Sequence, residues 1–115
     1  MARTNKYLGA LTKLLGQVSP RLAVTHQLAF KNVFGAVAGY VDDRIFVSCG
    51  TFGLAVRLPP ETLERLFTEK GVRRLRYFPN GHVKKEYAVL PRRMIRDRRQ
   101  FKGLVSQSIE YALSC

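Results

Sequence analysis

Residues 34–60 read FGAVAGYVDDRIFVSCGTFGLAVRLPP, and this stretch decides the fold of the chain. It has the pattern of three short strands joined by two tight turns. We expect the first turn at Asp42-Asp43, because Asp side chains can hydrogen-bond their own backbone, and the second at Gly50–Gly53. Proline cannot donate to a strand ladder, so Pro59-Pro60 ends the third strand. Two hairpins in succession predict an antiparallel meander.

The faces of the meander follow from period-two alternation. In the middle strand, Ile45, Val47 and Cys49 share one face, and Arg44, Phe46 and Ser48 share the other. We predict that the first three point into the core. Cys49 is then a buried, unreactive thiol that packs as a small apolar residue.

Length and charge bound the class of protein. The chain has 115 residues, which is the size of one domain, and we predict a single domain over residues 1–115. Its 20 Lys and Arg face only 8 Asp and Glu, which gives a net charge of +12 and predicts attraction to polyanions. No apolar run reaches the roughly 18 residues of a membrane span, and the N-terminus lacks a signal-peptide pattern. We expect no membrane partner and a cytoplasmic location.

Three helices are predicted around the strands. Residues 4–18 place apolar residues at three- and four-residue spacing, and residues 60–70 begin with a proline and end before Gly71. The last helix begins at Asp97, whose carboxylate can cap it while Gln100 reaches back. Residues 21–33 stay open between an extended lead-in to the first strand and a loop with a short helical turn.

A second hairpin completes the sheet. Residues 72–78 and 83–90 flank an Asn-Gly turn, with Leu75 and Tyr77 on one face of the first strand and Arg74 and Arg76 on the other. The order α-β-β-β-α-β-β-α predicts a two-layer α+β fold, in which helices cover one face of a five-stranded antiparallel sheet. We predict one buried core that contains Leu54, Val56, Leu66, Leu75, Tyr77, Leu104 and Ile109.

The uncovered sheet face suggests self-association. With helices on one face only, the other face carries Ala55, Arg57, Arg74, Arg76 and Phe46 in this arrangement. Such a mixed surface suits a symmetric partner, so we predict a homodimer.

The positive charge is concentrated in one segment. Residues 70–102 hold twelve Lys or Arg, and only Glu86 and Asp97 oppose them. Arg outnumbers Lys there, and Arg is the better bidentate partner for phosphate. Arg98 and Arg99 fall in the first turn of a predicted helix, where the helix dipole disfavours cations. We predict nucleic-acid or other anion binding by Arg73, Arg74, Arg76, Lys84, Lys85, Arg92, Arg93, Arg96, Arg98, Arg99 and Lys102.

Patterns of catalytic and metal sites are absent from the sequence. His26 has no second ligand residue at metal-binding spacing. Ser48-Cys49-Gly50 resembles a nucleophile on a turn, but no motif supplies a base. The glycines match neither a dinucleotide fingerprint nor a phosphate-binding loop, and turns explain them. We therefore expect no enzyme, no cofactor and no metal.

Four stretches carry a family resemblance: VFG at 33–35, GYVDDRIF at 39–46, LAVRLP at 54–59 and PNGHVKKEYAVLP at 79–91. In their order and spacing, the sequence resembles the TfoX N-terminal domain family over about residues 30–113. That family usually has Met and a second Gly where this sequence has Val33 and Ala36. The resemblance implies a two-layer fold like that of type III secretion chaperones, a link to competence-gene regulation, and no known catalytic residues. Full-length regulators carry a second, helical domain, and we expect this chain to be a stand-alone N-terminal domain.

Two functions remain open from the sequence. The first is a regulatory domain, similar to competence regulators, that binds nucleic acid through the basic segment. The second is a dimeric, chaperone-like interaction module whose charge meets an acidic protein. Phosphate contacts carry position rather than sequence information, so no DNA site follows from the pattern.

Overall fold

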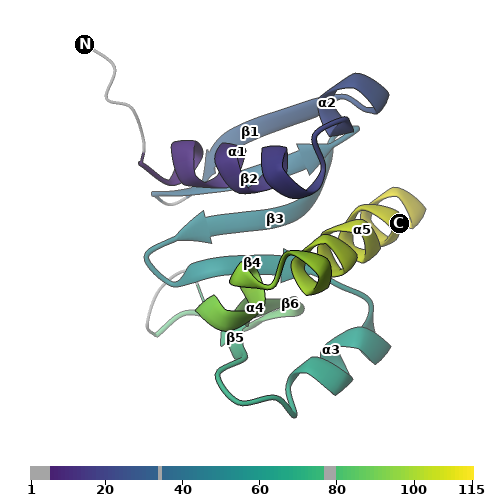
Figure 1. Ribbon diagram of the computed structural model, residues 1–115. Helices are drawn as coiled ribbons and strands as arrows, with labels where there is room; N and C mark the ends of the chain where they lie inside the picture. The colour runs from purple at the N-terminus through teal and green to yellow at the C-terminus, as the bar shows by residue number, and fades with distance from the viewer. Residues whose placement is uncertain (1–5, 34, 77–79) are drawn as a thin grey trace.

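The protein is built from one antiparallel sheet with its helices packed against one face (Figure 1). The structure is a computed structural model and describes residues 6–33, 35–76 and 80–115. Its six strands follow the order β1-β2-β3-β4-β6-β5, and every pairing is antiparallel. The elements are α1 (Lys6–Val18), α2 (Leu22–Thr25), β1 (Leu28–Val33), β2 (Ala36–Val41), β3 (Arg44–Gly50), β4 (Gly53–Arg57), α3 (Pro60–Leu66), β5 (Arg73–Leu75), β6 (Lys84–Leu90), α4 (Arg92–Arg96) and α5 (Arg98–Ser114).

The predicted meander is confirmed as β2, β3 and β4. Asp42 and Asp43 connect the first two strands with φ angles of 47° and 66°. Two consecutive left-handed residues define the type I′ turn that matches the twist of a hairpin, and Asp tolerates this conformation better than most residues. Gly53, with φ of 112°, closes the second turn.

The sheet has six strands, so the prediction of five is wrong. Residues 21–33, for which the sequence left two options open, contain both a short helix, α2, and an edge strand, β1. β1 pairs with β2 from Leu28↔Val41 to Val33↔Ala36. Its residues are half-buried or exposed, so the alternation that marks a strand is weak in the sequence.

The predicted order of elements is also incomplete. Besides α2 and β1, the structure adds α4, which begins directly after Pro91 and buries Met94. Pro91 follows the last residue of β6 and is the N-cap of α4, so it lies where the strand ends and the helix begins. The predicted cap of the last helix is confirmed, because the Gln100 amide donates to Asp97 Oδ1 at 3.2 Å.

Buried apolar residues form two clusters. The larger lies between helices and sheet and includes Leu54, Val56, Leu66 and Leu104 as predicted, with Ile109 packed against it. Leu75 was assigned to that core wrongly. It lies in a smaller cluster on the opposite sheet face with Ala55, Tyr87 and Val89. Tyr77 lies outside the described residues.

A β-bulge in β3 reverses part of the predicted alternation. Gly39 pairs with Val47 and Tyr40 pairs with Ile45, so Phe46 is the extra residue. Phe46 and Val47 both enter the larger cluster, whereas Ile45 packs against the smaller one. The predictions that Ile45 faces the helices and that Phe46 faces away are therefore wrong. Glycine is required at position 39, since an added Cβ would lie 2.7 Å from Val47 Cγ1.

Candidate nucleic-acid interface

The corner between α4 and α5 gathers exposed positive charge. The chain leaves α4 at Arg96, passes through the extended residue Asp97, and enters α5 at Arg98. Asp97 is the acid of this corner, and its carboxylate caps α5 through the Gln100 amide. Six basic side chains are exposed here: Arg92, Arg93, Arg96, Arg98, Arg99 and Lys102.

Arg93 joins this corner to the start of the basic segment. Its Nη1 donates to the Lys70 carbonyl at 2.6 Å, and its Nη2 lies 4.0 Å from Glu69 Oε1. Gly71 turns the chain beside this contact with φ of 89°, and an added Cβ there would lie 3.1 Å from Pro91 Cβ. The fold therefore brings residues 69–71 against the start of α4, although about twenty residues separate them in the chain.

The basic residues of β5 take different directions. Arg73 pairs with Val89 of the smaller cluster and donates to the Phe52 carbonyl at 2.9 Å, so it faces away from the helices. The Arg74 guanidinium lies over the Phe67 ring, with 4.4 Å between Cζ and the ring centroid. Because Phe67 caps α3, Arg74 lies on the helix side of the sheet, and its predicted place on the uncovered face is wrong.

The remaining predicted residues lie near the β5–β6 connection. Arg76 donates to the Gly81 carbonyl at 3.2 Å. Lys84 also interacts within the protein, and Lys85 lines a cavity beside Arg74. The eleven predicted residues therefore form no uniform patch, since the guanidinium groups of Arg73, Arg76 and Arg93 donate hydrogen bonds to backbone carbonyls. The exposed remainder is concentrated at the α4–α5 corner.

Acidic side chains of the protein neutralise little of the positive charge on the basic segment. Among residues 6–33, 35–76 and 80–115, two ion pairs form: Arg57 with Glu86 at 3.2 Å, and Arg93 with Glu69 at 4.0 Å. The second is at the limit of an ion pair and is exposed, so it contributes little. The basic corner therefore keeps a positive field that solvent and counterions screen.

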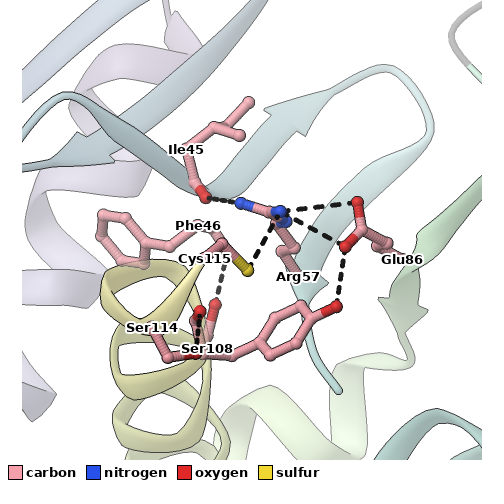
Figure 2. Close-up of polar contacts among 8 residues, drawn as sticks. Ile45, Phe46, Arg57, Glu86, Ser108, Ser114 and Cys115 are labelled. Carbon is pink, nitrogen blue, oxygen red and sulfur yellow. Dashed lines mark hydrogen bonds and ion pairs between the residues drawn. The ribbon is translucent and has the colours of Figure 1, made fainter. Parts of the chain in front are cut away.

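A polar cluster beside the C-terminal end of α5 was missing from the sequence prediction (Figure 2). Arg57 donates to the Ile45 carbonyl and to Glu86, each at 3.2 Å, and Tyr111 donates to the same carboxylate at 2.8 Å. The hydrogen bond from Tyr111 and the Arg57 charge lower the pKa of Glu86. The register places Arg57 opposite Tyr87 of the smaller cluster, in agreement with its predicted face, while its guanidinium reaches the Tyr111 ring and joins β4 and β6 to α5.

Ser108 adds a second link between α5 and the sheet. Its buried hydroxyl donates to the carbonyl of the bulge residue Phe46 at 2.7 Å, as Figure 2 shows. The contacts of Tyr111 and Ser108 join residues 25 and 62 positions apart, so no local pattern could reveal them. They hold α5, and with it the basic corner, in a fixed place on the sheet.

A metal site and a membrane-spanning helix are also missing from the described residues. Within the described parts of the chain, no group of three or more His, Cys, Asp or Glu could hold a metal ion. No helix among the described residues combines the length and the apolar character needed to cross a membrane.

Comparison with known proteins identifies the family. No curated protein sequence matches the chain. The family model described as the TfoX N-terminal domain matches residues 21–112, from the residue before α2 to the last turns of α5. That family is not known for enzymatic activity. The matched range contains the six strands of the described residues and the whole basic corner, and it confirms the resemblance drawn from the sequence: the chain belongs to the TfoX N-terminal domain family.

Proposed function

We propose that this protein is a non-enzymatic regulatory domain, similar to competence regulators, that binds nucleic acid through phosphate contacts. Family membership supports the regulatory part of the proposal. The basic segment supports the nucleic-acid part, because clustered Arg and Lys are the electrostatic footprint of such proteins.

The α4–α5 corner is the observation that carries the proposal. Arg92, Arg96, Arg98, Arg99 and Lys102 are exposed and form no ion pair with any described residue. Arg98 and Arg99 occupy the first turn of α5, where each cation is disfavoured by about 0.3–1 kcal/mol. Asp97 is one acid beside these five bases, and a charge that works against the stability of its own helix is expected where function requires it.

Binding through phosphate contacts depends on the charge of the nucleic acid more than on its base sequence. Phosphate contacts fix the position of a protein on a nucleic acid but do not distinguish bases. We therefore expect weak binding with little sequence preference and a strong dependence on salt. Each neutralised phosphate of a duplex adds about 0.9 to the slope of log K against log salt.

The first test measures this slope. We expect the wild-type protein to bind a fluorescent DNA duplex in anisotropy titrations from about 50 to 200 mM salt, with a negative log–log slope. Replacing Arg96, Arg98 and Arg99 with Gln should flatten the slope by up to about three units if each meets a phosphate. Folding should be unaffected, since these side chains are exposed.

A charge-matched control separates the corner from net charge alone. Lys6, Lys13 and Arg21 lie outside the basic segment and are also exposed, so their triple Gln variant loses the same charge. We expect it to keep nearly the wild-type slope. Equal flattening in the two triple variants would contradict a localised interface. Absence of any DNA or RNA binding at about 50 mM salt would contradict the proposal and favour an acidic protein partner.

A further inference from the structure

A cavity beside the basic segment has the size of a small-ligand site. It has a volume of about 370 Å³ and opens between α3 and the strands β5 and β6. Pockets that hold small molecules have volumes of about 300–1,000 Å³ and combine apolar walls with a few polar groups. Leu63 and Phe67 of the α3 region supply apolar wall here, and Arg74 and Lys85 supply positive charge.

Arg74 and Phe67 make a stacking platform at this cavity. The guanidinium lies over the ring at 4.4 Å, and Arg74 is exposed and lines the cavity together with Phe67. Nucleic-acid-binding proteins hold unstacked bases on aromatic rings and on Arg guanidinium planes. A base could thus extend the stack that Phe67 begins.

The charges around the cavity orient such a ligand. Arg74 and Lys85 line the cavity and are both exposed, so they can hold the phosphate beside a base that enters it. Glu64 and Glu86 also line the cavity and repel phosphate. Arg57 and Tyr111 already donate to the Glu86 carboxylate, so the Glu64 carboxylate is the one that can accept a hydrogen bond from the exocyclic amine of a base. The cavity therefore suits a base, with its phosphate held at the cationic side.

We propose that this cavity takes one unstacked base of a single-stranded nucleic acid, stacked on Arg74 over Phe67. The inference rests on the proposed function, because the basic segment holds the strand that supplies the base. It adds a preference for single strands, which phosphate contacts alone do not give.

A preference for single strands would distinguish base stacking from charge, because charge alone favours binding to the duplex. A duplex carries more charge per length, and neutralising one of its phosphates contributes about 0.9 to the salt slope against about 0.7 for a single strand. A protein that binds through charge alone therefore favours the duplex. Stacking of one base contributes enough to reverse this order, as its loss weakens binding about 5-fold to 150-fold.

The experiment compares a single-stranded oligonucleotide with the duplex of the same sequence, in anisotropy titrations at low salt. We expect wild-type protein to bind the single strand more tightly. Arg74→Gln should weaken single-strand binding at least about fivefold more than duplex binding. The control Arg92→Gln removes the same charge from an exposed residue that does not line the cavity, and should weaken both ligands equally.

A second variant keeps the charge unchanged. Phe67→Leu retains an apolar side chain but removes the flat ring, so the single-strand preference should fall while duplex affinity remains. Equal binding of both ligands by wild-type protein, or equal effects of Arg74→Gln and Arg92→Gln on the ratio of the two affinities, would overturn the inference and leave the proposed function standing. Absence of binding to either ligand would overturn both.

Discussion

The thiol of Cys49 illustrates how a single residue responds to its surroundings. The side chain is 8 % exposed in the larger cluster, and burial raises its pKa. Because the thiolate is the reactive form, a raised pKa and a buried sulfur both slow its chemistry. The predicted burial is thus confirmed, although Ile45, which was expected beside it, lies on the opposite face.

We expect Cys49 to react slowly with a thiol reagent in the folded protein. In a Cys115→Ser variant, where Cys49 is the remaining thiol, labelling at pH 8 should be slow until denaturant is added. Mass spectrometry at timed intervals measures this rate. Complete labelling of the native protein within the time needed for a free thiol would contradict the prediction.

Glu86 should make stability depend on pH. Its pKa is lowered in the folded protein, so its contribution is complete above the unfolded value of about 4.3 and is lost as pH falls through the folded value. The carboxylate is partly exposed, so salt should reduce the effect. In denaturant titrations, Glu86→Gln should be less stable than wild type at pH 7, and the difference should shrink at about pH 3. An unchanged difference at the two pH values would exclude a role for the charge.

The sequence was enough to locate the clustered basic residues, but it did not show which groups their side chains contact. All eleven predicted basic residues could be found by counting, because clustered charge is a local property. Their partners could not, since the carbonyls of Lys70 and Phe52 approach Arg93 and Arg73 only through the fold. The same reason hid the cluster of Arg57, Glu86 and Tyr111.

For helices and strands, the residues that begin or end an element were predicted better than the sheet face toward which each strand residue points. The turn at Asp42-Asp43, the proline start of α3 and the Asp97 cap were all predicted from local chemistry and confirmed. The faces of β3 and β5 were wrong. One extra residue at Phe46 resets the alternation of β3, and β5 packs Leu75 onto a sheet face that the sequence pattern treats as uncovered.

The packing of α3 can be tested at Leu66. This side chain is 3 % exposed and belongs to the larger cluster. Leu66→Ala should lower the free energy of unfolding by about 2–5 kcal/mol, the range for buried leucines that leave a cavity. Arg65→Ala, at the exposed neighbouring position, is the control and should change stability little. A loss below about 0.5 kcal/mol for Leu66→Ala would show that α3 does not contribute to the core.

The two faces of the sheet differ in what covers them. One is covered by helices, and in Figure 1 α1 and α5 cross in front of it. On the other face, cross-strand neighbours Ala38, Ser48 and Ala55 are small. These three side chains are fully buried, so a partner could meet only the exposed residues of this face, such as Lys31 and Arg73, and the homodimer stays a prediction.

Sedimentation at micromolar concentration checks the homodimer prediction. We expect a species of twice the 13.1 kDa chain mass. Because each copy carries a net charge of +12, added salt should screen the repulsion and raise the dimer fraction. A 13.1 kDa species alone at every salt concentration would contradict the prediction.

The first helix has a practical consequence for work on this protein. The family match begins at residue 21, yet Leu11, Leu15 and Val18 of α1 are almost fully buried in the larger cluster. A version trimmed to the matched residues would uncover the apolar surface beneath them, and exposed apolar patches cause aggregation. Poor solubility of such a version would then reflect a missing cover and not a misassigned domain. Expression for any binding study should therefore retain α1, Lys6–Val18.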